Sequence, residues 1–308
     1  RRAFIGYAGV RPWTTAMAEI VAPLRSIYAR ALEVGDLTIA VLGASMADLY
    51  AFHSGATLDD LRPQMEGTVQ AIAQHGIASA RAPHAELVRS VRILLDPAGA
   101  DVRHAPTVSD DASAAIRFEI ALNDLHRALL FGDPAAALEI ARRDYASLDT
   151  PARPATHVVY WTYSTVALLA AVERGLVPRR EVARRIRRGR QDVRAWAKAV
   201  RANAYRTHWV DAADARSRGK ASAALERYER AIEEAWSAGA RHDAALIAEQ
   251  AGEYSEALGR RRNAEAFFRE AHAAYRQWGA RAKVARLETD RAAELGVVRG
   301  GAATSITR

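Results

Sequence analysis

The sequence predicts an all-α protein built from antiparallel helix pairs, and three observations lead to this prediction. Half of the 308 residues are apolar, which is enough for a substantial core. Alanine is abundant, whereas the 19 glycines and 10 prolines are too sparse to interrupt helices often. Four residues near the C-terminus recur at a spacing of 40 residues. They are Gly219, Ala224, Tyr228 and Ala231, and then Gly259, Ala264, Phe268 and Ala271.

A repeat period of this size is typical of helical solenoids. In each copy we expect the glycine in the turn between two helices, where a positive φ or a close approach is needed. The first alanine lets the second helix lie close to the first, and the aromatic residue fills the space between helices. The last alanine packs against the next unit. The repeat therefore predicts a TPR-like α-solenoid of antiparallel helix pairs that wind into a right-handed superhelix.

Turn residues divide the chain into helices joined by short connections. Thr57 and Asp133 are expected N-caps, Pro134 is expected at the first helical position, and Ser109 is expected to cap the helix that follows it. Residues 1–15 are predicted as a loop. Helices are expected over residues 17–34, 37–53, 57–74, 85–95, 111–130, from 134, 155–174, 179–200, 205–218, 221–237, 243–258, 261–277 and 282–295.

These elements predict three parts of unequal regularity. Residues 1–202 form a degenerate helical-repeat region, in which the segment Ile77–Thr107 is the least regular. Residues 203–295 hold two TPR-like repeats and a capping helix, and residues 296–308 read as a linker or tail. Because the chain begins at Arg1 rather than Met, we expect it to be a segment of a longer protein.

The formal net charge of +8 belongs to one predicted helix. From Pro178 to Arg201 there are nine arginines and one lysine against two acidic residues, so the rest of the chain is balanced. Such a helix presents either a solvated face or a contact for an acidic protein or domain surface. Nucleic acid is disfavoured because Trp196 is the helix's single aromatic residue. The candidate partner contacts are Arg184, Arg185, Arg187, Arg188, Arg190 and Arg194.

No motif for catalysis or for a cofactor is found. The chain has no cysteine, which excludes disulfides and thiolate metal sites and fits a cytoplasmic location. It has no phosphate-binding Gly-Lys-Ser/Thr loop and no His-Glu-x-x-His, and it has no apolar run that predicts a membrane span. We therefore predict no catalytic, cofactor-binding or metal-binding residue. His208, Asp211 and Asp214 share a helix face, but a solvated face is the commoner reason for such a pattern.

The C-terminal repeats also carry a family resemblance. The stretches 227–235, 244–251 and 264–275, followed by Trp278-Gly-Ala-Arg-Ala-Lys-Val284, resemble the helical-repeat segment of bacterial STAND-type multidomain signalling ATPases. The resemblance covers most of residues 30–287, and Trp278 joins the repeat residues as its structural signature. It implies kinase-like and AAA-type ATPase domains before this segment, and sensor and histidine kinase domains after it. The catalytic residues of the family match no position here.

We therefore expect a non-catalytic helical-repeat scaffold or sensor region of a signalling protein, which contacts a protein partner or flanking domains. The alternative is a ligand-sensing TPR-like domain of an ATPase-type transcriptional regulator. A helical enzyme is the least favoured hypothesis, because the aromatic residues that could line its cavity fit a core better. These residues are Tyr160, Trp161, Tyr205 and Trp209.

Overall fold

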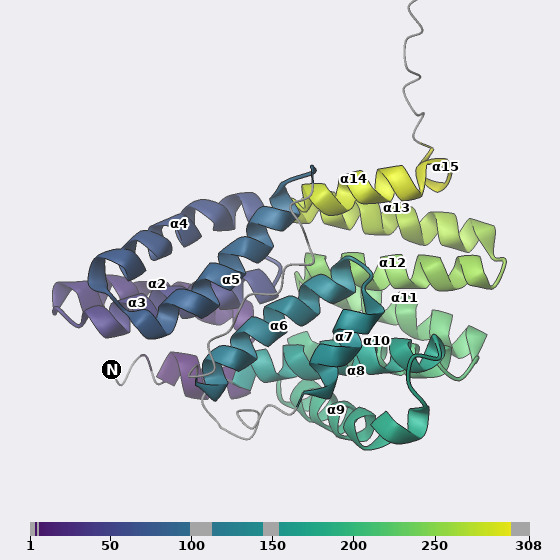
Figure 1. Ribbon diagram of the computed structural model, residues 1–308, viewed down its shortest axis with the longest axis horizontal. Coiled ribbons are helices and arrows are strands. Elements are labelled where there is room, and N and C mark those ends of the chain that lie inside the picture. Colours follow the sequence, from purple (N-terminus) through teal and green to yellow (C-terminus); the bar gives the residue numbers. More distant parts are fainter. Residues whose placement is uncertain (1–3, 5, 99–112, 144–153, 297–308) are drawn as a thin grey trace, which may run out of the picture.

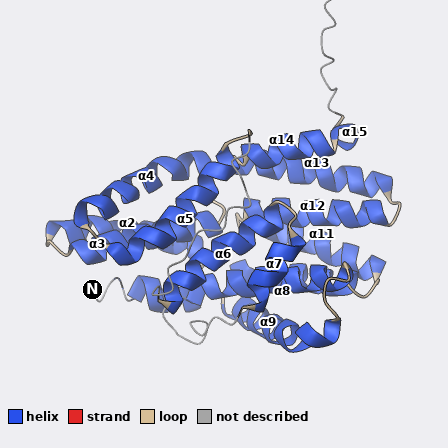
Figure 2. Ribbon diagram, in the orientation of Figure 1, coloured by secondary structure: helices blue, strands red, loops and turns tan. Residues whose placement is uncertain are grey.

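The computed structural model describes residues 4, 6–98, 113–143 and 154–296, and all its regular elements are helical (Figures 1 and 2). No residue in these ranges lies in a β-strand. The prediction of an all-α protein is confirmed. The predicted tail after Gly296 and the predicted cap Ser109 lie outside the described residues.

Four helices pack side by side in the N-terminal part of the chain (Figure 1). The segment predicted as a loop before them contains two short helical turns, η1 and η2. The fourth helix begins seven residues before its predicted start and continues through Pro83 in its second turn. The elements are η1 (Gly6–Val10), η2 (Arg11–Trp13), α2 (Met17–Glu33), α3 (Leu37–His53), α4 (Leu58–His75) and α5 (Ala78–Leu95).

The middle of the chain follows the predicted boundaries closely. Asp133 caps α7 by accepting a hydrogen bond from the Ala136 amide at 3.0 Å, with Pro134 at the first position. Ser113 caps α6 by accepting one from the Ile116 amide. The elements are α6 (Ala114–Leu130), α7 (Pro134–Arg142), α8 (Pro154–Glu173), α9 (Arg179–Ala199) and η4 (Arg201–Asn203).

Helix α8 passes through the centre of the packed helices. Within the described residues it is the one helix that is long and apolar enough to cross a membrane, and 83% of its most apolar window is buried inside the structure. A core helix has the same length and composition, so α8 is weak evidence for a membrane span.

The C-terminal part contains the repeated pairs α10 with α11 and α12 with α13, which pack against each other in sequence order (Figure 1). The predicted final helix is interrupted after Asp290 and forms two shorter helices. The elements are α10 (Ala204–Arg216), α11 (Ala221–Ser237), α12 (Arg241–Ala257), α13 (Arg261–Trp278), α14 (Arg281–Asp290) and α15 (Ala292–Leu295).

The repeated residues occupy matching environments. Gly219 and Gly259 have φ angles of +69° and +71°, the left-handed conformation expected for the turn. The alanines and aromatic residues of both copies are buried, as is Trp278. Phe268 lies directly over Gly252, where an added Cβ would be 2.8 Å from its ring. The aromatic residue therefore fills space left by a small residue of the preceding helix, as predicted.

Helices from the N-terminal and C-terminal parts of the chain contact each other. Helix α14 packs against α5 and α3 packs against α8. The turn after α3 approaches the start of α12 so closely that a Cβ on Gly55 would lie 2.7 Å from the Gly239 carbonyl. Arg281 and Asp59 form an ion pair at 2.8 Å nearby. One continuous cluster of buried apolar residues extends from Ala8 to Leu287 across these contacts.

Candidate functional site

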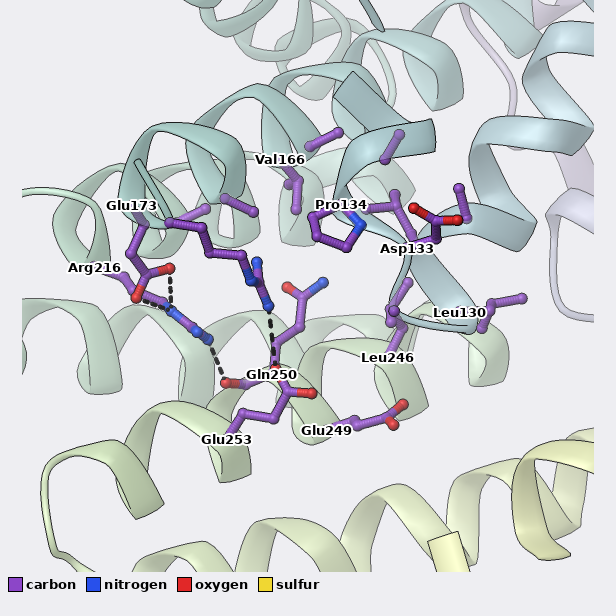
Figure 3. Close-up of a pocket in the computed structure, with 18 of the residues that line it drawn as sticks. Leu130, Asp133, Pro134, Val166, Glu173, Arg216, Leu246, Glu249, Gln250 and Glu253 are labelled. Atoms are coloured by element: carbon purple, nitrogen blue, oxygen red, sulfur yellow. Dashed lines mark hydrogen bonds and ion pairs between the residues drawn. The ribbon is translucent and has the colours of Figure 1, made fainter. Parts of the chain in front are cut away.

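A charged pocket lies where the α6–α7 turn, α8, α10, α12 and α14 converge (Figure 3). Its volume is about 80 Å³. Small residues such as Ala167, Ala170 and Ala213 line part of it and leave the space open. Four basic and four acidic side chains complete the lining, so its formal charge is balanced. These side chains are Arg174, Arg216, Lys283 and Arg286, with Asp133, Glu173, Glu249 and Glu253.

One side of the charged pocket is closed by a double contact between α8 and α10. Arg216 Nε lies 2.9 and 2.8 Å from the two carboxylate oxygens of Glu173, and its Nη1 donates to the Gln250 carbonyl at 2.8 Å (Figure 3). The guanidinium also lies 5.1 Å from the ring centre of Tyr254. These contacts commit both Arg216 and Glu173 to holding the helices together.

The opposite side is closed by a buried lysine from α14. Lys283, whose side chain is 1% exposed, forms an ion pair with Glu249 at 2.8 Å and donates to the Leu130 carbonyl. Tyr275 donates to the same carboxylate at 2.6 Å, and burial together with Glu249 raises the pKa of its hydroxyl. This second group is therefore also satisfied.

The third charge pair of the pocket is loose. Arg174 Nη2 and Glu253 Oε2 are 4.0 Å apart, beyond hydrogen-bond distance, and their side chains are 40% and 37% exposed. Partial burial and the negative charge of Glu249 raise the pKa of the Glu253 carboxyl. Glu249 and Glu253 stand one turn apart on α12 and so face the same space. The pocket therefore has two committed charge pairs and one that is available.

The predicted arginine-rich helix, α9, forms a second feature. Between α9 and α10 runs a groove of about 370 Å³, which we call the α9–α10 groove. Asp211 and Asp214 of α10 accept hydrogen bonds or ion pairs from Arg179, Arg190, Arg194 and Arg218. Arg187 also lines this groove. Five arginines against two aspartates leave three positive charges there.

The six candidate contact residues are divided among three faces of α9. Arg187, Arg190 and Arg194 line the α9–α10 groove. Arg185 donates to the carbonyls of Ala141 and Arg143 at the end of α7 and is committed to packing. Arg188 pairs with Asp192 on its own helix at 2.7 Å, and Arg184 is exposed. The structure therefore brings together half of the predicted set.

A third charged group is fully buried, and we call it the Asp243 centre. Asp243 accepts hydrogen bonds from Tyr163 at 2.8 Å and Tyr205 at 2.6 Å, and pairs with Arg206 at 3.0 Å. The side chains of Asp243 and Arg206 are 0% and 2% exposed. Burial alone would raise the pKa of Asp243, but His242, Arg206 and Tyr205 together lower it to about 2.

Three buried histidines adjoin the Asp243 centre. The rings of His53 and His242 each lie 5.7 Å from that of His126, which stacks on Tyr163 at 4.8 Å. Burial is the largest cause that lowers the pKa of each, to about 3 for His53. All three are therefore neutral at pH 7. They come from α3, α6 and α12, so they link the N-terminal, middle and C-terminal helices.

The aromatic residues that could line an enzyme cavity lie in or near the core, and Tyr205 belongs to the Asp243 centre. Tyr160, Tyr205 and Trp209 are core residues, and Trp161 is half-buried near Arg188. The charged pocket is lined by none of these four aromatic residues. Within the described ranges, no group of three or more His, Asp or Glu residues is placed to hold a metal ion.

Sequence reasoning missed the charged pocket and the Asp243 centre. The charged pocket draws its residues from helices between α6 and α14, and Tyr163 and Asp243 are 80 positions apart. Each residue looks like an ordinary amphipathic position in its own helix. Comparison with protein-family models, with curated proteins and with solved structures finds no match for this chain. The motifs are therefore the whole basis of the resemblance to signalling ATPases.

Proposed function

We propose that this chain is a non-catalytic, TPR-like helical-repeat scaffold of a signalling protein, and that it binds an acidic surface of a partner or flanking domain through the α9–α10 groove. In this proposal the helix pairs stack into a solenoid that winds as a right-handed superhelix. The matching turns at Gly219 and Gly259, and the sequential packing from α10 to α14, support that arrangement. The family resemblance supports the signalling context and a cytoplasmic location.

The observation that carries the proposal is the incomplete charge balance of the α9–α10 groove. Four arginines share the carboxylates of Asp211 and Asp214, and Arg187 has no ion-pair partner among the described residues. Exposed guanidiniums in a row attract carboxylates and speed association. Ala183 and Ile186 add an apolar floor, which a protein segment can contact and a free ion cannot.

Binding of a fluorescent oligo-glutamate peptide, with oligo-glutamine as its neutral control, tests this proposal. The wild-type chain should bind the acidic peptide, and its affinity should fall as the salt concentration rises. The double variant R187E/R194E should weaken binding about tenfold, since each exposed pair contributes up to about 1 kcal/mol. The matched control R261E/R262E makes the same charge change on exposed residues of α13 and should leave affinity close to wild type.

Two results would contradict the proposal. Equal loss in both double variants would mean that net charge alone, and no particular groove, attracts the peptide. Preferential binding of duplex DNA over the acidic peptide would reassign the groove to nucleic acid.

The non-catalytic part of the proposal has its own test. The isolated chain should hydrolyse no ATP or GTP above the buffer rate, because no phosphate-binding loop is found in the sequence. Nucleotide turnover that a point change such as E253Q or R216Q abolishes would overturn this part and favour the enzyme hypothesis.

A further inference from the structure

The charged pocket contains three polar groups whose hydrogen-bonding capacity is unused among the described residues. Arg174 and Glu253 approach each other to 4.0 Å without a hydrogen bond. Gln250 accepts from the Trp209 indole at 2.9 Å through its side-chain oxygen, which leaves its amide NH₂ group as a donor. One anion, one cation and one neutral donor thus lie within two adjacent segments, the end of α8 and the middle of α12 (Figure 3).

We propose that the charged pocket binds a small zwitterion, a free α-amino acid with a short side chain. Its ammonium group pairs with Glu253, and its carboxylate pairs with Arg174 and the Gln250 amide. The side chain then faces the small and apolar residues of the wall, among them Ala167, Ala170 and Leu246. This site is separate from the α9–α10 groove, since the two share no lining residue.

Charge balance favours a zwitterion over a ligand of one sign. A lone ammonium on Glu253 would take that carboxylate from Arg174 and leave the guanidinium without a partner. A lone carboxylate on Arg174 would leave Glu253 beside Glu249, whose charge already disfavours its ionised form. A zwitterion supplies both charges and replaces the ion pair between Arg174 and Glu253. Because that pair is exposed and long, breaking it costs little free energy.

The size of the pocket limits the ligand. A water-sized sphere needs roughly 10–15 Å³, so a volume of about 80 Å³ has room for a ligand of only a few non-hydrogen atoms. The pairs Glu173–Arg216 and Glu249–Lys283 close the two sides and are held by hydrogen bonds or ion pairs of 2.8–2.9 Å. The cavity therefore fits an amino acid no larger than alanine or serine.

Titration calorimetry on the 308-residue chain tests the inference with three matched ligands. They are L-alanine, L-lactate, which has a hydroxyl in place of the ammonium group, and L-alaninamide, which lacks the carboxylate. L-Alanine should bind at least about tenfold more tightly than either analogue, because each analogue loses one hydrogen-bonded charge. The variants E253Q and R174Q should each reduce L-alanine affinity by a similar factor.

The variant E265Q is the matched control, since Glu265 forms an exposed pair with Arg269 on α13 at 3.6 Å. It should bind L-alanine as the wild type does. Three outcomes would overturn the inference: no binding of L-alanine by the wild type, equal binding of alaninamide, or equal loss in E265Q. None of them bears on peptide binding at the α9–α10 groove, so the two proposals can fail separately.

Discussion

Two clusters of this protein join arginines to aspartates, and they differ in what surrounds them. In the Asp243 centre, one carboxylate meets Arg206 and two tyrosine hydroxyls in a place without exposed surface. In the α9–α10 groove, two carboxylates are shared by several arginines, and Arg194 is 50% exposed. The same pair of residue types is therefore fully buried in one place and partly exposed in the other.

The difference teaches that the number of charges says little about their role. A buried ion pair is costly to break because the remaining charge has no water around it. An exposed pair contributes little, because water and salt screen it.

Acid should separate the two clusters most strongly. His53, His126 and His242 have pKa values below the ordinary 6.5, so they are neutral in the fold and become protonated on unfolding. Stability is therefore full above pH 6.5 and falls as the pH drops towards about 3, the pKa of His53. From pH 7.5 to 5.0, His53 alone lowers the free energy of unfolding by about 2 kcal/mol, and His126 and His242 act in the same direction. Urea unfolding at pH 7.5 and 5.0 measures this change in the free energy of unfolding.

The acid effect has an internal control. The variant H126F keeps an aromatic ring against Tyr163 and removes one titrating group, so it should reduce the pH dependence of stability. The groove carboxylate Asp214 does not act in this range, since its pKa lies below 3.8. An unchanged slope in H126F would show that other groups cause the acid sensitivity.

Removal of the buried anion should have the next largest effect. The variant D243N leaves Arg206 charged and buried, and we expect it to lower the free energy of unfolding by about 3–5 kcal/mol at pH 7.5. Chemical denaturation monitored by tryptophan fluorescence gives this value. A loss below about 1 kcal/mol would mean that the centre is no more structural than the groove.

A smaller change at the same place refines the estimate. The variant Y205F removes only the 2.6 Å hydrogen bond to Asp243 and keeps the ring. A hydrogen bond to a charged group contributes about 1.5–3 kcal/mol, so we expect a loss in that range by the same denaturation measurement. If Y205F leaves the free energy of unfolding unchanged, Tyr163 and Arg206 satisfy the Asp243 carboxylate by themselves.

The smallest effect is expected in the groove. The variant D211N removes a carboxylate shared by Arg190 and Arg194, yet it should change the free energy of unfolding by less than about 1 kcal/mol. The same variant leaves the groove more positive and should bind oligo-glutamate more tightly. A large loss of stability in D211N would show that the groove carboxylates are as important to the fold as Asp243.

Local signals in the sequence predicted the helices well. Gly219 and Gly259 mark turns, and Asp133 with Pro134 marks a helix start, because these residues act within a few positions of themselves. The start of α5 differs from its prediction: the helix begins at Ala78 and continues through Pro83, which stands in its second turn.

The sites could be predicted only where they lie on one helix. The charge of α9 is contiguous in sequence, so its arginines were found, although Arg185 and Arg188 are turned away from the groove. Asp243 and Glu253 look like surface positions of an amphipathic helix. Their environment is set by residues of α8 and α10, and a single sequence does not contain the distances between helices.

The crossing of Gly55 with Gly239 has a consequence for how the chain acquires its fold. Helix pairs such as α12–α13 are joined by short turns. Their contacts are local in sequence, so we expect these pairs to form early and fast. The hydrogen bond from Arg241 to the Gly55 carbonyl spans 186 positions, so a long loop must close before it forms. We expect this crossing to set the rate of folding, and a side chain at position 55 to slow that step while the local pairs still assemble.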